Sequence, residues 1–192
     1  MNSSARLRRA LMMGTNPQSG DLPVLIQQLG TEPDFFVRDM LTWAITRHPR
    51  EDSFPLLVAA LSDACAASQA LHTLSKINHP DTWSVLSAEM FHSEDVALRT
   101  TAWRLAAAVV PAEEVHGLVA ELVLELGRGD EDTQRSLNRV LAQLGAPSRA
   151  RLEAIATQVH AALALFDDPS SDGLRNVDLA RKIALWGTHE QD

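Results

Sequence analysis

The sequence has few of the residues that build disulfide-linked, thiolate-metal or membrane-spanning structures. It contains one cysteine, Cys65, which excludes an intramolecular disulfide and a zinc site made of several thiolates from this chain. Its most apolar window, Leu105 to Val110, stops at Pro111, far short of the roughly 20 residues that a membrane-spanning helix needs. We therefore expect no membrane span and a reducing, cytoplasmic location.

Motifs of several enzyme classes are also missing. The sequence contains neither usual form of the glycine-rich phosphate loop and no His-Glu-x-x-His pair, and its seven histidines fall far apart without short ligand spacing. The residues therefore predict a protein that is not an enzyme, with no catalytic residue, no metal site and no cofactor.

Composition and charge favour a soluble globular chain. The 45% apolar content is ordinary for such a protein, which argues against disorder throughout. The formal net charge of -8 disfavours a general, charge-driven affinity for nucleic acid or for anionic membranes. A charge that is unevenly distributed still leaves room for a local basic surface.

An apolar triplet with spacings of three and then four residues recurs five times along the chain. Because 3.6 residues make one turn, this spacing places each triplet on one face of an α-helix. Successive triplets begin 32, 29, 32 and 37 residues apart. The triplets are Leu22, Leu25 and Leu29; Phe54, Leu57 and Leu61; Trp83, Leu86 and Met90; Val115, Leu118 and Leu122; and Leu152, Ile155 and Val159.

A second helical segment is predicted after each triplet, with turn formers and acids between the two and a proline near the end of most units. These second helices are expected at residues 36–48, 66–77, 97–109, 133–144 and 174–186. The chain is therefore predicted to be all-α, with about five helix pairs. The expected parts are a basic N-terminal helix or cap at 1–20, a repeat domain at 21–186 with units at 21–49, 52–80, 81–111, 112–146 and 148–186, and a disordered tail at 187–192.

Two of the second helices begin with a shared motif. The segments Asp34-Phe35-Phe36-Val37-Arg38-Asp39-Met40-Leu41 and Asp95-Val96-Ala97-Leu98-Arg99-Thr100-Thr101-Ala102 resemble the signature of the HEAT repeat family, including its bacterial form, the phycobilisome-lyase HEAT-like repeat. The resemblance implies a right-handed α-α superhelix, an α solenoid, whose second helices line the concave face. A tetratricopeptide array fits less well because the chain has no tyrosine, and an armadillo array would need a third helix in each unit.

The predicted second helices carry ten cations and two acids, a local charge of +8 in a chain whose total is -8. One interpretation is structural, because acid-base pairs four residues apart, such as Asp34 with Arg38, Asp95 with Arg99 and Glu131 with Arg135, stabilise helices. The other is a basic binding stripe, because arginine offers a planar fork of donors to carboxylates and phosphates.

The tryptophans on these helices are further candidates for partner contacts, since 100° per residue puts both of them off the centre of the buried stripe. The predicted contacts on the concave face are Arg38, Trp43, His72, Lys76, Arg99, Trp103, Arg104 and Arg139.

The leading hypothesis is a scaffold or adaptor that binds a protein or peptide partner of acidic character. The alternative is nucleic-acid binding or DNA repair, because HEAT-like alkylpurine DNA glycosylases use cations, tryptophans and an aspartate, which Arg104, Arg139, Trp43, Trp103 and Asp39 would supply here. A lyase-like chaperone of a chromophore follows only from the name of the repeat.

Overall fold

The computed structural model describes residues 2–167 of the 192-residue chain, and this part is all-helical. The described part divides into two compact units, residues 2–111 and 112–167, and their border coincides with the predicted border between the third and fourth helix pairs. No helix in the described part of the chain is long and apolar enough to cross a membrane. The predicted second helix at 174–186 and the tail at 187–192 lie outside the described residues.

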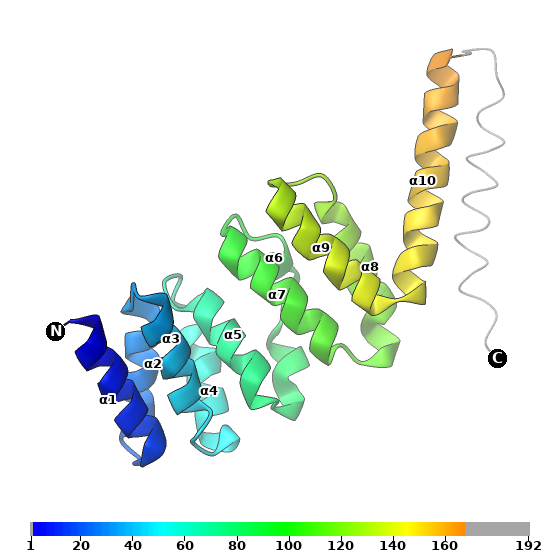
Figure 1. Ribbon diagram of the computed structural model, residues 1–192. Helices are drawn as coiled ribbons and strands as arrows, with labels where there is room; N and C mark the ends of the chain where they lie inside the picture. Colours follow the sequence, from blue (N-terminus) through cyan, green and yellow to red (C-terminus); the bar gives the residue numbers. More distant parts are fainter. Residues whose placement is uncertain (1, 168–192) are drawn as a thin grey trace. The chain divides into compact units, whose positions relative to one another are not determined.

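The first unit consists of helices in two layers (Figure 1). Helices α1, α3, α5 and α7 lie side by side in one layer, and α2 and α4 pack behind them. The elements are α1 (Ser3–Thr15), α2 (Asp21–Thr31), α3 (Phe35–Ile45), α4 (Arg50–Ala60), α5 (Ala67–Ile77), the 3-10 helix η1 (Pro80–Val85), α6 (Ala88–Phe91) and α7 (Val96–Val109). The predicted N-terminal helix is therefore present, and α3, α5 and α7 correspond to three predicted second helices.

The second unit contains α8 (Val115–Leu122), α9 (Glu131–Leu144) and α10 (Ala146–Asp167), with the 3-10 helices η2 (Ala112–Glu114) and η3 (Val123–Glu125). Helix α8 packs against both α9 and α10. Gly145 has a positive φ of 73°, which lets the chain turn sharply from α9 into α10. The last apolar triplet is on a helix as predicted, but its third member, Val159, is 50% exposed.

The predicted first helix of the third pair is wrong. Trp83 lies on the 3-10 helix η1, Leu86 has an extended backbone, and the short α6 follows. The hydroxyl of Thr82 donates to the carbonyl of His79 at 2.7 Å, and that of Ser84 donates to the carbonyl of Asp81 at 2.8 Å. Such local bonds compete with a regular helix, and they explain why an apolar spacing of three and four does not form one here.

The start of α3 is fixed by four hydrogen bonds. The Asp34 carboxylate accepts the backbone N–H groups of Phe36 and Val37 at 2.9 and 3.3 Å, which caps the helix. The carboxylate of Glu32, two residues before the cap, accepts the N–H of Asp34 at 2.9 Å. Arg38, four residues after the cap, donates to the carbonyl of Glu32 at 2.9 Å. The turn and the helix therefore hold each other in place.

The start of α7 repeats these contacts one by one. Asp95 accepts the N–H groups of Ala97 and Leu98 at 2.8 and 3.2 Å. The Ser93 hydroxyl, two residues before the cap, accepts the N–H of Asp95 at 3.2 Å, and Arg99 donates to the Ser93 carbonyl at 2.6 Å. The two segments that share the motif therefore share its geometry.

Helix α9 begins in a related way. Asp130 accepts the N–H of Thr133 at 2.8 Å. Gln134, four residues after the cap, donates to the carbonyl of Arg128 at 2.7 Å, so glutamine takes the place that arginine has in the other two helices. The neighbouring Arg135 pairs instead with acids in the first turn of α9.

Candidate functional site

A groove of about 260 Å³ crosses the exposed side of the first unit. Three helices contribute to it, and all three are predicted second helices. The lining residues are Phe35, Arg38 and Asp39 from α3, Ser68, Gln69 and His72 from α5, and Thr101 and Arg104 from α7. Three of the predicted contacts, Arg38, His72 and Arg104, thus lie together in one groove.

The wall of the groove between α3 and α5 is held by a buried polar cluster. The hydroxyls of Thr42 and Thr73 lie 3.1 Å apart, and the side-chain amide of Gln69 donates to the Thr42 hydroxyl at 3.2 Å. Thr73 also donates to the Gln69 carbonyl at 2.9 Å. Because both threonines are buried, these bonds satisfy groups that would otherwise be costly to bury, and they fix Gln69 at the groove.

Both arginines of the groove are oriented by nearby acceptors. Arg38 donates to the carbonyls of Glu32 and Pro33, each at 2.9 Å. Arg104 donates from Nε to the carbonyl of Thr100 at 3.0 Å and from Nη2 to the hydroxyl of Thr101 at 3.4 Å. Since a guanidinium has five N–H donors, each side chain keeps donors beyond those that hold it.

His72 is half-buried between these charges. Burial lowers the pKa of the His72 imidazole, and the nearby Lys76 and Arg104 lower it further, while Asp39 acts in the opposite direction. The imidazole is therefore neutral at pH 7, and an anion that entered the groove would favour its protonation. Lys76 itself is exposed on α5 and does not line the groove.

Two of the predicted contacts are wrong. Trp103 is fully buried, and its Nε1 donates to the carbonyl of Phe91 at 2.9 Å. Arg99 is only 2% exposed, and its guanidinium carbon lies 5.7 Å from the centre of the Trp103 ring. Both side chains belong to the core of the first unit. Arg99 ties down the turn before α7, and Trp103 fills the space between α7 and α6.

The predicted acid-base pairs also need correction. The pair of Glu131 and Arg135 forms, as the spacing of four residues predicts. Arg38 and Arg99 instead donate to backbone carbonyls of the preceding turn, while the aspartates before them cap their helices. The cations at these two places therefore anchor a turn, which the spacing alone does not reveal.

Four of the predicted contacts occupy one recurrent position along the chain. Each lies nine residues after an aspartate that accepts an N–H group at or just before the start of its helix. These residues are Trp43 after Asp34, His72 after Asp63, Arg104 after Asp95 and Arg139 after Asp130. Trp43, Arg104 and Arg139 are exposed and His72 is half-buried, whereas the residues ten and eleven positions after each aspartate are buried. Arg139 belongs to the second unit and is described only within it.

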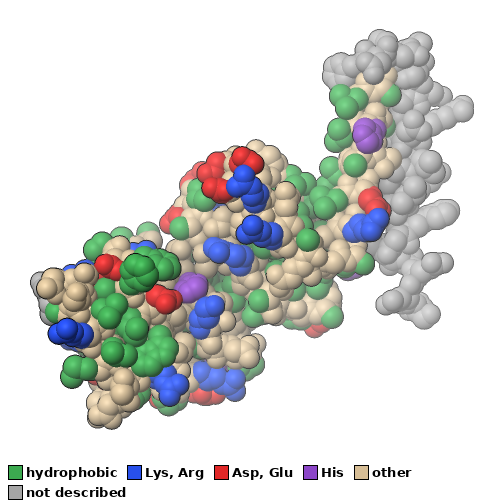
Figure 2. Space-filling model, in the orientation of Figure 1, with side chains coloured by type: hydrophobic (Ala, Val, Ile, Leu, Met, Phe, Trp, Pro, Cys, Tyr) green, Lys and Arg blue, Asp and Glu red, His purple; other side chains and the backbone are tan. Residues whose placement is uncertain are grey.

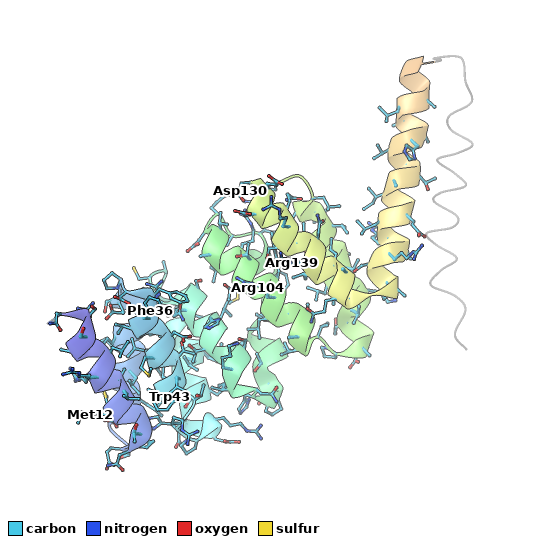
Figure 3. All side chains as sticks on the ribbon, viewed as in Figure 1. Met12, Phe36, Trp43, Arg104, Asp130 and Arg139 are labelled. Atoms are coloured by element: carbon cyan, nitrogen blue, oxygen red, sulfur yellow. The ribbon has the colours of Figure 1, made fainter. Side chains whose placement is uncertain are left out.

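The exposed pair of Phe35 and Phe36 is a feature that the sequence analysis missed. The two side chains are 65% and 72% exposed, and their rings meet edge to face with centroids 5.6 Å apart. Figure 3 places Phe36 and Trp43 at opposite ends of α3, and Figure 2 shows an apolar patch over α1 and α3 beside a histidine and basic side chains. The equivalent residues Glu131 and Asp132 of α9 are charged, and this difference is the signal that could have revealed the pair.

Comparisons with known proteins leave the family open. No protein-family model matches the chain, and no curated protein matches it. Among residues 2–167, no group of three or more His, Cys, Asp and Glu side chains is arranged to hold a metal ion. The function therefore has to be inferred from the groove itself.

Proposed function

We propose that this chain is a non-catalytic scaffold that binds an acidic segment of a partner protein in the groove across α3, α5 and α7. In this proposal the fold is a HEAT-like right-handed superhelix of about five helix pairs. The observation that carries the proposal is the groove itself, because arginines from α3 and α7 and a histidine from α5 line it beside an exposed pair of phenylalanines.

The repeat interpretation is supported by the local geometry of α3, α7 and α9. In each, an aspartate caps the helix and a side chain four residues later donates to the carbonyl two residues before the cap. The network is present at three of the four second helices among residues 2–167, and α5 lacks it. Local contacts that recur along the chain are typical of stacked repeats, in which each pair buries its apolar faces on its neighbours.

The size and lining of the groove favour a segment of a protein over a free small molecule. Pockets for small molecules typically measure about 300 to 1,000 Å³, and the present groove falls below that range. Arg38 and Arg104 offer donor forks that suit carboxylates, and the exposed Phe35 and Phe36 offer apolar area for a neighbouring side chain. A short acidic stretch next to an apolar residue matches both parts.

DNA is the less favoured ligand. Of the five residues that would resemble a HEAT-like glycosylase site, Trp103 is inside the core. The formal net charge of -8 disfavours a long phosphodiester backbone, which would extend beyond the groove over the rest of the surface.

The experiment is a selection of random dodecapeptides displayed on phage against the full chain, followed by fluorescence anisotropy with the selected peptides. We expect peptides rich in Asp and Glu with at least one large apolar residue. Arg104→Glu should weaken their binding at least about tenfold, since it places a repulsive charge in the groove. Arg47→Glu makes the same charge change on an exposed residue outside the groove and serves as the matched control.

Two results would contradict the proposal. One is that the selected peptides bind Arg104→Glu as tightly as the unaltered chain, which would place their site elsewhere. The other is that no peptide is selected while duplex DNA binds with a log affinity that falls linearly with log salt, which is the signature of a phosphate-backbone contact.

A further inference from the structure

The groove is rich in hydrogen-bond donors. Six of its eight lining residues carry N–H or O–H groups, namely Arg38, Ser68, Gln69, His72, Thr101 and Arg104. Asp39 is the one lining residue with a carboxylate. A phosphoryl group has three strong acceptor oxygens and a charge of about −1.5 to −2, whereas a carboxylate has two oxygens and a single charge. The donor set exceeds what one carboxylate can use.

The two arginines are prepared for such a ligand before it binds. Arg38 is tied to the turn that precedes α3, and Arg104 is tied to the preceding turn of α7. Less side-chain entropy is lost on binding when a side chain is already held in its bound orientation. The two guanidinium groups come from different helices and line the same groove, so each offers donors to an anion there.

The charges around His72 favour an anion that carries more than one negative charge. The charged groups that act on its imidazole are Asp39 on α3, Lys76 on its own helix and Arg104 on α7, and Arg38 lines the same groove. Burial together with Lys76 and Arg104 lowers its pKa, so the uncharged form predominates at neutral pH. A dianion would relieve the repulsion among the cations and attract a proton to His72, and a monoanion would do so less.

We infer that the groove is a receptor for a phosphomonoester, namely the phosphoserine or phosphothreonine side chain of the partner segment, held between Arg38 and Arg104 with His72 beside it. The inference rests on the proposed function, since it names the acidic group that the partner brings. The phosphoryl oxygens accept from the guanidinium groups, and the hydroxyls of Ser68 and Thr101 complete the contacts. Phe35, at the same groove, contacts the residue next to the phosphorylated one.

The test uses the isotope-labelled full chain and four probes, with binding followed by the NMR signals of the His72 ring. The probes are N-acetyl-phosphoserine amide, N-acetyl-glutamate amide, inorganic phosphate and a 12-base-pair DNA duplex. We expect phosphoserine amide to bind about tenfold more tightly than glutamate amide and to raise the pKa of His72. It should also bind more tightly than inorganic phosphate, because its organic part contacts Phe35.

Variants make the assignment specific to the groove. Arg104→Gln should weaken phosphoserine binding about tenfold, because it removes the charge-assisted bonds of the guanidinium but keeps the aliphatic part of the side chain. Arg47→Gln should leave the affinity unchanged. His72→Gln should bind more weakly and should lose proton uptake on binding, a readout that a purely structural role would not change.

Four outcomes would overturn the inference. They also show whether the proposed function fails with it. Equal or tighter binding of glutamate amide would exclude a phosphomonoester receptor and leave the acidic-segment proposal intact. Binding of display-selected peptides without binding of any of the small anions would do the same. Phosphate binding that Arg104→Gln does not weaken would be adventitious. A DNA duplex that displaces phosphoserine amide and binds more tightly than the selected peptides would overturn both proposals.

Discussion

Helices α3 and α7 begin with the same contacts, but the tryptophan of α3 is exposed and that of α7 is buried. In both, an aspartate caps the helix and an arginine four residues later ties down the preceding turn. Trp43 of α3 is nevertheless 37% exposed, whereas Trp103 of α7 is fully buried. Counted from the cap, Trp43 is the ninth residue and Trp103 is the eighth.

One residue along an α-helix is a rotation of about 100°, and this shift is enough to move a side chain from the core to the surface. The eighth position after the cap is buried in both helices, where it holds Thr42 in α3 and Trp103 in α7. The ninth position is exposed in both, where it holds Trp43 and Arg104. Residue type alone therefore misassigns these tryptophans, while register from the cap assigns both.

The largest expected effect is the loss of Trp103. Trp103→Ala removes a buried ring and its bond to the Phe91 carbonyl, and we expect a loss of about 3 to 5 kcal/mol in unfolding free energy. Trp43→Ala should cost less than half as much, because part of its ring is already exposed to water. Urea unfolding followed by circular dichroism measures both. Equal losses would show that Trp43 is as much a core residue as Trp103.

Gly14 of α1 lies against Trp43 and provides a test of that contact. A Cβ atom at this position would clash with a ring carbon of Trp43 and would lie 2.8 Å from the Cα of Ala44. Gly14→Ala should therefore separate α1 from α3 and destabilise the chain by about 1 to 3 kcal/mol in the same urea experiment.

Gly117 provides the matched control for this substitution. It lies within α8, and a Cβ there would meet only a carboxylate oxygen of Glu114 at 3.9 Å. Gly117→Ala should stabilise the chain by about 0.5 to 1 kcal/mol, because alanine loses less backbone entropy in a helix. A Gly14→Ala variant that is equally stabilised would show that α1 does not press against Trp43.

Loss of the buried Arg99 of α7 should destabilise the chain more than loss of Arg38 of α3, as for the tryptophans, but the effect should be smaller. Arg99→Leu leaves the Ser93 carbonyl without a charged donor at a buried site and should cost about 1.5 to 3 kcal/mol. Arg38→Leu should cost about 0.5 to 1 kcal/mol, since water can reach its half-exposed surroundings. Thermal unfolding of the two variants provides the comparison.

Gln134 of α9 suggests the control for these arginines. Because glutamine makes the equivalent bond in α9, Arg99→Gln should retain more stability than Arg99→Leu. If the two substitutions at this position cost the same, the carbonyl bond is not what Arg99 contributes.

The smallest expected difference is in how stability depends on pH. It concerns the residues two positions before the caps, Glu32 at α3 and Ser93 at α7. The Glu32 carboxylate accepts two bonds from Arg6 at 2.7 and 2.8 Å, and Arg6 holds the pKa of Glu32 below its ordinary value. A lowered pKa contributes stability that is present above the unfolded value, about 4.3, and is lost as the pH falls through the folded value. Glu32→Gln should therefore be less stable than the unaltered chain at pH 7, and the difference should narrow toward pH 3.

Ser93 is the counterpart of Glu32 at α7 and cannot titrate in this range. Ser93→Ala should show the same difference from the unaltered chain at pH 7 and at pH 3, as measured by urea unfolding at both values. A pH-independent effect of Glu32→Gln would mean that the Arg6 contact is not what stabilises the carboxylate.

The sequence predicts much of the helical organisation and part of the candidate site. The apolar triplets locate α2, α4, α8 and α10, and the second helices correspond to α3, α5, α7 and α9. The third triplet fails because hydroxyl groups bond to the nearby backbone in the segment around η1. The predicted membership of one repeat domain at 21–186 stays a prediction.

Residue type alone is not enough to identify the residues of the groove. Arg38, His72 and Arg104 could be chosen as charged or titratable residues on second helices, but nothing in that choice distinguishes them from Arg99. In the sequence Phe35 and Phe36 are part of the shared motif, and their exposure follows only from their place in the first turn of α3.

The sequence by itself determined the all-α class, the spacing of the helix pairs and the capping aspartates, because periodicity and caps act within a few residues of the chain. The tertiary structure decided which arginine anchors a turn inside the core, which tryptophan is buried and which side chains share a groove. These properties depend on how each helix packs against its preceding turn and against neighbouring helices. A rotation of about 100°, one residue along a helix, is enough to move a side chain between the core and the surface.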